Sequence, residues 1–276
     1  MNIMDRDRRP LERLAYAARA SQVFARQPQE ALDRAIEKVA TWRDERRSRV
    51  PSVFPEWSEE CFHQRIGAGL PCSKCTAFCE VWKCALDDLA SRQIRYGRGA
   101  FGGWDDGDSR LVQLAWCLVR HLRPKRVVET GVARGLTTRT ILEALECNGD
   151  GHLWSIDLAP LLDRGLADET GAAVPNRLYG RWTLLRGSSR RVLPGLVTDL
   201  RTIDLFVHDS MHTTRNVRFE LEWVWPALSR GGVLLIDDVE RNAAMGMFAK
   251  AHPRADVMSC ASGDGKAMIG CIVKPD

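Results

Sequence analysis

The sequence predicts an α/β fold: a Rossmann-like, doubly wound sheet of seven strands, mostly parallel with an antiparallel last strand, after an N-terminal helical extension. From Pro124 onward, short apolar runs alternate with segments of helical periodicity. This order is typical of a parallel sheet with helices on both faces. The last two apolar runs are joined by a short turn at residues 263–266, which suits a hairpin and therefore an antiparallel final strand.

Residues 1–100 are expected to form the helical extension, which serves as a substrate cover or an oligomer interface. Its apolar residues recur at helical spacing in two stripes, Leu11, Leu14 and Ala15, then Ala31, Ile36, Val39 and Ala40. Pro28 is expected to separate two helices, because proline disfavours helix in the residue before it. The charged residues between the stripes are interpreted as a solvated face.

Residues 101–276 are expected to form the main domain. Asp108 or Ser109 can cap its first helix, which Pro124 ends. The expected strands are 126–129, 152–156, 182–185, 203–207, 233–236, 256–259 and 267–273. The helix after the fourth of these strands carries Val217, Leu221 and Val224 on one face, and Gly231-Gly232 is expected to break it and start the next strand.

Three acidic residues stand where predicted strands end. Asp209 follows the fourth strand, and the pair Asp237-Asp238 follows the fifth. Because the carboxyl ends of parallel strands share one edge, where ligands bind, we expect these carboxylates to lie together. Oxygen donors without a nearby cysteine suit Mg²⁺ or another hard divalent cation, and His212 suits a base. Adjacent side chains of a strand point to opposite faces, so the strand must end at Asp237-Asp238 for both to bind. In the alternative, one of the pair is a ligand and the other a helix cap.

A glycine-bearing turn, Glu129-Thr130-Gly131-Val132-Ala133-Arg134-Gly135, joins the first expected strand to its helix. Glycine permits close approach of a ligand, and the helix start offers free N–H groups. The spacing differs from Gly-x-Gly-x-x-Gly, which argues against a nicotinamide cofactor. Asp157 closes the second strand, where a carboxylate can accept hydrogen bonds from ribose hydroxyls, and Glu129 can orient the polar end of the same ligand.

On these residues, the chain from about residue 126 to its end resembles the class I S-adenosylmethionine-dependent methyltransferases. Residues 129–135 match the first motif of that family, Asp157 its ribose-binding acid, and Gly187-Ser188-Ser189 the segment near the adenine. The resemblance implies S-adenosylmethionine as the cofactor. The cofactor-binding residues that it implies are Glu129, Thr130, Gly131, Gly135, Asp157, Ser188, Ser189 and Asp209.

Within this family, Asp209-Ser210-Met211-His212 and Asp237-Asp238 resemble the divalent-metal-dependent O-methyltransferase branch, which acts on hydroxyls of sugars, macrolides and cephalosporin-type compounds. The resemblance implies Asp209, Asp237 and Asp238 as Mg²⁺ ligands, and His212 as the general base beside Asp209. The acceptor that it implies is a small-molecule hydroxyl, such as that of a sugar or a glycosylated natural product. Relatives often have glycine where this chain has Ser210, so the turn that aims His212 departs from the pattern.

Two other functions stay open. The chain could be a metal-independent N- or O-methyltransferase of the same fold, in which the acids serve as caps and binders. It could also be a non-catalytic binding or scaffold protein that retains the fold. Activity that EDTA leaves unchanged would indicate the first, and failure to bind S-adenosylmethionine would indicate the second.

Five of the nine cysteines fall between residues 61 and 84. A structural Zn²⁺ site is one interpretation, with Cys61, Cys72, Cys75 and Cys79 as ligands and His63 as a further donor. The spacing fits neither the common zinc-finger pairs nor an iron–sulfur run, so unliganded thiols on an amphipathic helix are the alternative. The remaining four are interpreted as buried thiols: Cys117, Cys147, Cys260 and Cys271.

The net charge of +4 is mild, and acids and bases are interspersed, so nucleic acid is not indicated as a partner. The N-terminus does not resemble a signal peptide, and no apolar run reaches the roughly 18 residues needed to cross a bilayer. We therefore expect a cytoplasmic protein with no membrane contact, which could form a homo-oligomer.

Overall fold

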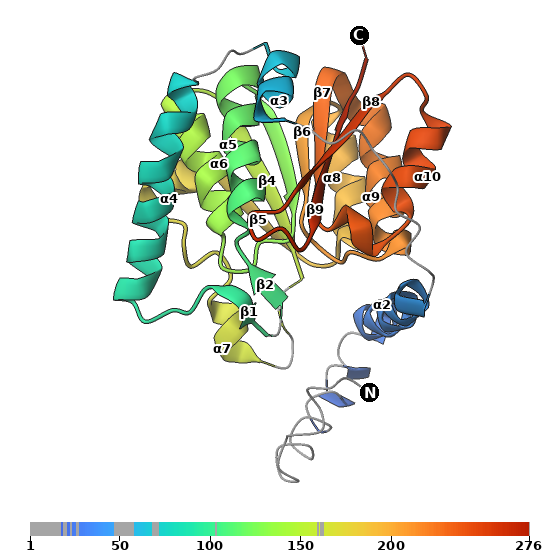
Figure 1. The fold of residues 1–276 in the computed structure, drawn as a ribbon. Helices are drawn as coiled ribbons and strands as arrows, with labels where there is room; N and C mark the ends of the chain where they lie inside the picture. Colours follow the sequence, from blue (N-terminus) through green and yellow to red (C-terminus); the bar gives the residue numbers. More distant parts are fainter. Residues whose placement is uncertain are drawn as a thin grey trace.

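The computed structural model describes residues 18, 21–22, 24–25, 28–46, 58–67, 72–102, 104–158, 160 and 163–275. Its main sheet has seven strands in the order β5-β4-β3-β6-β7-β9-β8 (Figure 1). These are β3 (Arg126–Thr130), β4 (His152–Asp157), β5 (Trp182–Arg186), β6 (Ile203–His208), β7 (Leu228–Ile236), β8 (Asp256–Ala261) and β9 (Met268–Val273). The pairs from β5 to β7 are parallel, and β9 is antiparallel to both β7 and β8. The predicted fold class is confirmed, including its antiparallel last strand.

Helices cover both faces of this sheet (Figure 1). The helices are α2 (Pro28–Arg46), α3 (Glu59–Arg65), α4 (Ser73–Ser91), α5 (Ser109–Leu122), α6 (Leu136–Asn148), α7 (Arg164–Asp168), α8 (Ser189–Leu200), α9 (Thr214–Ala227) and α10 (Ala244–Ala251), with short 3₁₀ turns η2 (Asn176–Arg181) and η3 (Val239–Arg241). Alternate residues of β3 enter different cores: Val127 packs with α5 and α6, whereas Val128 packs with α8, α9 and α10. Both faces of the central strands are therefore buried, as a doubly wound sheet requires.

The helices α3 and α4 share the core of the main domain. Phe62 and Phe78 belong to the same buried cluster as Trp116 of α5, and Leu89 packs with Leu136 of α6. The expected division between residues 100 and 101 falls inside β1 (Gly97–Phe101), which pairs with β2 (Trp104–Asp106) in a small hairpin. The cysteine-rich segment is thus packed onto the sheet-covering helices.

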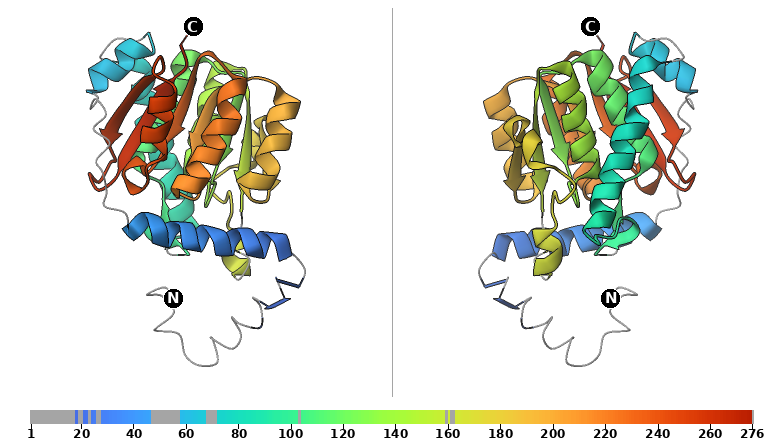
Figure 2. Two further views of the ribbon diagram at one scale, coloured as in Figure 1. Left: turned by 90° about the vertical axis from the view of Figure 1, so that its right-hand side faces the viewer. Right: turned by 90° about the vertical axis from the view of Figure 1, so that its left-hand side faces the viewer.

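The helix α2 lies across one end of the sheet (Figure 2) and contacts α9. Only part of its expected apolar stripe docks: Ala31 is buried, but Ile36 and Val39 are 37% and 49% exposed, whereas the charged Glu37 is 7% exposed. The expectation was wrong for Ile36 and Val39 because the surface under α2 carries Arg190 and Arg215, which pair with Glu37. The earlier stripe at Leu11, Leu14 and Ala15 lies outside the described residues.

The start of β7 also differs from the expectation. The helix α9 ends at Ala227, and β7 begins at Leu228, so Gly231 and Gly232 lie inside the strand. A Cβ on Gly232 would lie 2.8 Å from the Ser229 carbonyl oxygen, and the register between β6 and β7 shifts at this point. These glycines permit an irregularity in the strand, and the helix ends before them.

The cysteines differ in burial: four are exposed, two are partly buried and three are buried. The expected zinc set is not brought together, because Cys61 and Cys79 are exposed while Cys72 and Cys75 face α5. Phe78, Ala85 and Leu89 define the inner face of α4, which turns Cys79 outward. Cys147 is exposed, contrary to the expectation of a buried thiol, whereas Cys117 and Cys271 are buried.

None of the helices in the described part of the chain has the length and apolar character needed to cross a bilayer.

Candidate active site

The strand order reverses beside β3, because β4 lies on one side of it and β6 on the other. Ligands of open α/β sheets bind at such a switch point. There, the Gly131 amide donates to the Ile156 carbonyl at 2.9 Å, and the Asp209 amide donates to the Thr130 carbonyl at 2.8 Å. A Cβ on Gly131 would lie 1.9 Å from the Asp209 carbonyl oxygen, and φ at Gly131 is +88°. The glycine turn and the acidic turn after β6 are therefore in direct backbone contact.

Asp157 holds the glycine turn from the end of β4. Its Oδ2 accepts hydrogen bonds from the Val132 amide at 2.9 Å and the Ala133 amide at 3.3 Å. Its Oδ1 is buried and has no hydrogen-bond partner among the described residues. Burial raises the pKa of Asp157 above its usual range, and the two amides oppose this rise. One carboxylate oxygen is thus used structurally, and the other is available to a ligand.

Glu129 lies beneath the same turn and is fully buried. Its Oε2 accepts from the Thr138 hydroxyl at 2.8 Å and the Ser155 hydroxyl at 2.7 Å, while its Oε1 has no partner in the described structure. The neighbouring Thr130 hydroxyl donates to Glu220 at 2.7 Å. The hydroxyl proton of Thr130 is therefore already used by Glu220.

Burial raises the pKa of Glu129 to about 7, which predicts a pH-dependent stability. An acid whose pKa rises on folding stabilises the folded state at low pH, and this contribution is lost as pH rises from about 4.5 to about 7. Between about pH 5 and about pH 7.5, the wild type should lose about 2 kcal/mol more unfolding free energy than Glu129→Gln. Urea unfolding at both pH values measures this, with Glu45→Gln on exposed α2 surface as the control. Equal losses in wild type and Glu129→Gln would contradict the assignment.

At the ends of β6 and β7, donor atoms of Asp209, His212 and Asp237 lie within 4.8 Å of one another. The Nε2 of His212 is 4.0 Å from Asp209 Oδ1 and 3.7 Å from Asp238 Oδ2. The strand β7 ends at Ile236, and Asp238 has a left-handed backbone with φ of +53°. The predicted end of the strand at this pair is confirmed.

Burial and mutual repulsion disfavour the ionised form of these three carboxylates. Burial, then the charge of Asp237, raises the pKa of Asp209, and burial, then Asp238, raises that of Asp237. Burial raises the pKa of Asp238 to about 6, against the opposing charge of Arg241, whose Nε lies 2.9 Å from its Oδ2. Asp237 Oδ1 is buried without a hydrogen-bond partner in the described residues. Such hard oxygen donors fit a divalent cation. Asp209 and Asp237 are more available to it than Asp238, which is also paired with Arg241.

His212 is held as a neutral imidazole. Burial, followed by the charges of His208 and Arg241, places the pKa of His212 well below its usual range. Its Nδ1 is buried and has no partner in the described part of the chain. The ring of His208 stands edge-on to it, with centroids 5.4 Å apart. A neutral histidine with an unpaired nitrogen can accept a proton.

Glu220 of α9 is the functional residue that the sequence did not reveal. It is fully buried and accepts hydrogen bonds from Thr130, His208, Ser210 and Asn216. Burial acts to raise the pKa of Glu220, but His208 and the donated hydrogen bonds outweigh it and lower the pKa to about 2. The Ser210 hydroxyl, in place of the glycine of relatives, is one of these donors. A glutamate beside Val217, Leu221 and Val224 on a buried helix face was the available signal.

The remaining predicted cofactor-binding residues lie at the starts of α8 and α6. Ser188 precedes the first residue of α8, and its buried hydroxyl has no partner among the described residues. The Ser189 hydroxyl lies 3.4 Å from Asn216 Oδ1. Gly135, at the start of α6, has φ of +84°, and a Cβ there would lie 3.1 Å from Gly171 Cα. Ser188 and Ser189 thus follow β5, whereas Gly135 ends the glycine turn that follows β3.

Residues 128–239, which run from β3 to just beyond β7, match a family model described as a methyltransferase domain. Many solved structures have similar folds, among them the following three. The O-methyltransferase TomG from Streptomyces achromogenes, involved in tomaymycin synthesis and in complex with SAM, is 15% identical, with 71% of this chain and 90% of TomG covered and a TM-score of 0.53. An O-methyltransferase from Bacillus cereus in complex with SAH is 15% identical, with 77% and 96% covered and a TM-score of 0.51.

The SAH-bound methyltransferase PaMTH1 from Podospora anserina is 17% identical, with 76% of this chain and 100% of PaMTH1 covered and a TM-score of 0.52. No sequence among the curated proteins matches this chain. At such identities the solved structures establish the fold, and the family model places the domain in the sequence. Residues 128–239 therefore match a methyltransferase domain, and the chain shares the fold of these methyltransferases.

Proposed function

We propose that this chain is an S-adenosylmethionine-dependent O-methyltransferase that methylates a small-molecule hydroxyl with the help of a divalent cation. The contact between Gly131 and Asp209 carries this proposal, because it sets a cofactor turn directly against a group of carboxylates. The O-methyltransferases of similar fold in complex with SAM or SAH support the choice of cofactor and reaction.

The cofactor half consists of the groups left unpaired around the glycine turn. S-adenosylmethionine, when bound, supplies an electrophilic methyl group. Gly131 and Gly135 let the backbone approach it closely, and the free Oδ1 of Asp157 accepts from the ribose hydroxyls. Glu129 faces its polar end, and Ser188 with Ser189 lies toward its adenine.

The acceptor half consists of Asp209, Asp237 and His212, with Asp238 as a third carboxylate. These carboxylates would hold Mg²⁺ or a similar cation, which lowers the pKa of an acceptor hydroxyl as it does that of bound water. His212 then takes the hydroxyl proton on Nε2, the ring nitrogen nearest to Asp209 and Asp238. Glu220 fixes Ser210 and thereby the turn between Asp209 and His212, which aims the imidazole.

The acceptor that we propose is a sugar or a glycosylated natural product. Support comes from the resemblance of Asp209-Ser210-Met211-His212 and Asp237-Asp238 to sugar and macrolide O-methyltransferases, and from TomG, which is involved in tomaymycin synthesis. The test is methyl transfer from labelled S-adenosylmethionine to a panel of sugars, glycosylated macrolides and catechols, with and without EDTA. We expect activity that EDTA abolishes and Mg²⁺ restores. Activity unchanged by EDTA would favour the metal-independent methyltransferase, and no cofactor binding in a calorimeter would favour the scaffold.

The helix α2 is proposed to cover the cofactor half. It lies across this end of the sheet (Figure 2), and the charge of Arg34 acts on Asp157. Glu37 docks it by accepting from the Thr213 hydroxyl at 2.6 Å and by pairing with Arg190 and Arg215.

Glu37→Ala should therefore leave two guanidinium groups without their buried partner. We expect the KM for S-adenosylmethionine to rise about tenfold and the unfolding free energy to fall by about 3 kcal/mol. Steady-state kinetics and urea unfolding measure the two effects. Glu45→Ala, on the exposed side of the same helix, is the control. An unchanged KM for the cofactor in Glu37→Ala would contradict the covering role.

A further inference from the structure

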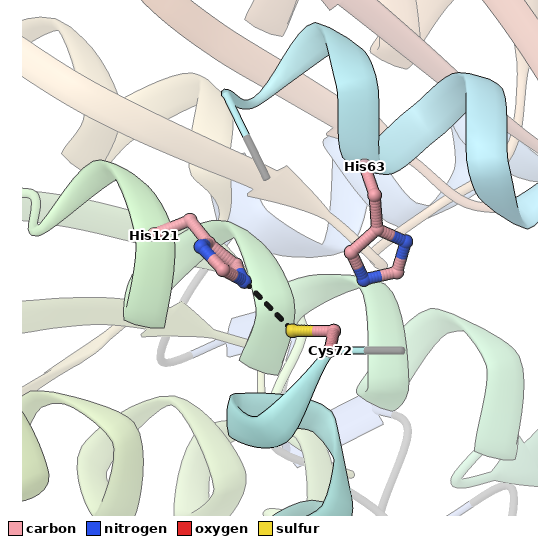
Figure 3. A group of neighbouring side chains, drawn as sticks. All are labelled: His63, Cys72 and His121. Atoms are coloured by element: carbon pink, nitrogen blue, oxygen red, sulfur yellow. Dashed lines mark hydrogen bonds between the residues drawn. The ribbon is translucent and has the colours of Figure 1, made fainter. Parts of the chain in front are cut away.

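Five histidine and cysteine side chains, of the types that can bind zinc, come together from α3, the start of α4 and α5. They are His63 of α3, Cys72 and Cys75 at the start of α4, and Cys117 and His121 of α5. The His63 Nε2 lies 3.1 Å from the Cys75 sulfur, and the Cys72 sulfur lies 3.0 Å from His121 Nε2. The sulfurs of Cys75 and Cys117 are 2.7 Å apart. Figure 3 shows the His63 and His121 rings on either side of Cys72.

Local helix geometry explains why these groups converge. Cys117 and His121 are four residues apart on α5, so they share one face of that helix. Cys72 is the N-cap of α4, and Cys75 lies in its first turn. The Trp116 indole donates to the Lys74 carbonyl at 2.7 Å, which fixes this turn against α5. The short helix α3 is anchored by Phe62, which is fully buried next to His63.

The donor set is the one that zinc prefers in closed structural sites. Thiolate and imidazole groups select Zn²⁺ over hard cations, and structural zinc sites take four ligands in a tetrahedron. Two triads share His63, one with Cys72 and His121 and one with Cys75 and Cys117, and within each triad the donor atoms lie within 4.8 Å.

We propose that this cluster binds one Zn²⁺, with His63, Cys72 and Cys75 as ligands and the fourth position taken by Cys117 or His121. The ion joins α3 and α4 to α5 and so fastens the N-terminal helices to the methyltransferase core. The site is independent of the proposed reaction, since it shares none of the residues around Gly131 and Asp209. It also differs from the set suggested by sequence spacing, which contained the exposed Cys61 and Cys79.

The metal content of the purified full-length protein tests this proposal. We expect one zinc per chain by elemental analysis after purification under reducing conditions. The double variant C72S/C75S should retain less than a tenth of it. The matched control is C61S/C79S, which makes the same two changes on α3 and α4 at exposed cysteines. Zinc lost from C61S/C79S and kept by C72S/C75S would overturn the assignment.

Two measurements on the wild type remain decisive if the double variant does not fold. Cobalt replacing zinc should give the visible spectrum of a tetrahedral ion with thiolate ligands. Zinc at about 100 times its Kd should raise the Tm of the chelated protein by about 5–10 °C and slow hydrogen exchange in α3. A wild-type chain that contains no zinc, takes up none on reconstitution and shows no shift in Tm would overturn the proposal. A failed methyl-transfer assay would have no bearing on it.

Discussion

Asp237→Ala is expected to abolish methyl transfer while S-adenosylmethionine still binds with an affinity within a few fold of the wild type. Asp237 has an unpaired, buried carboxylate oxygen and belongs to the group that we propose for the cation. It makes no hydrogen bond to the glycine turn, which Asp157 holds. Loss of an electrostatic group that acts in the transition state typically costs about 10²–10³ in kcat, and we expect at least that here. Single-turnover kinetics and calorimetric titration of the cofactor measure the two parts.

Asp199→Ala is the control for this substitution, because Asp199 is exposed near the end of α8. Asp209→Ala should lose activity as Asp237→Ala does. Because the Asp209 backbone, and not its side chain, contacts Gly131, cofactor binding should again survive. Normal turnover of both variants in EDTA would contradict the metal-dependent reaction.

Gly131→Ala is expected to be the most damaging addition of a single methyl group in the cofactor half. The new Cβ would lie 1.9 Å from the Asp209 carbonyl oxygen at a residue with φ of +88°. The left-handed backbone costs an alanine about 1–2 kcal/mol, and the clash with a fixed strand end adds a similar amount. We expect the unfolding free energy to fall by about 3 kcal/mol and cofactor binding to be lost.

Gly149→Ala separates these two causes. Gly149 has φ of +73°, but a Cβ there would meet nothing within 4 Å. It should therefore lose only the backbone contribution, about 1 kcal/mol, and keep cofactor binding. Urea unfolding of the two variants gives the comparison. Equal losses would show that the contact between the two turns is not tight.

The sequence contained enough to predict the sheet and the residues at its carboxyl edge. Apolar runs fix where strands end, and parallel order brings the ends of β3, β4, β6 and β7 to one side. Asp157, Asp209 and Asp237 could therefore be placed without knowledge of any contact. The end of β7 at Ile236 also followed, because two adjacent carboxylates cannot leave a regular strand on the same side.

Features that depend on packing between distant segments could not be predicted. The docking face of α2 is the polar one because Arg190 and Arg215, far along the chain, lie under it. Glu220 is buried because four donors converge on it from three segments. Cys117 and His121 join Cys72 and Cys75 only through the packing of α5 on α4, which no spacing within residues 61–84 reveals.

The most direct test of the central claim is anomalous diffraction from crystals grown with Mn²⁺ and S-adenosylhomocysteine. The proposed function predicts an anomalous peak for manganese beside Asp209 and Asp237. It also predicts that S-adenosylhomocysteine lies against Gly131, with its ribose at Asp157. Bound S-adenosylhomocysteine with no manganese at these carboxylates would contradict the claim that a divalent cation acts in the proposed methyl transfer.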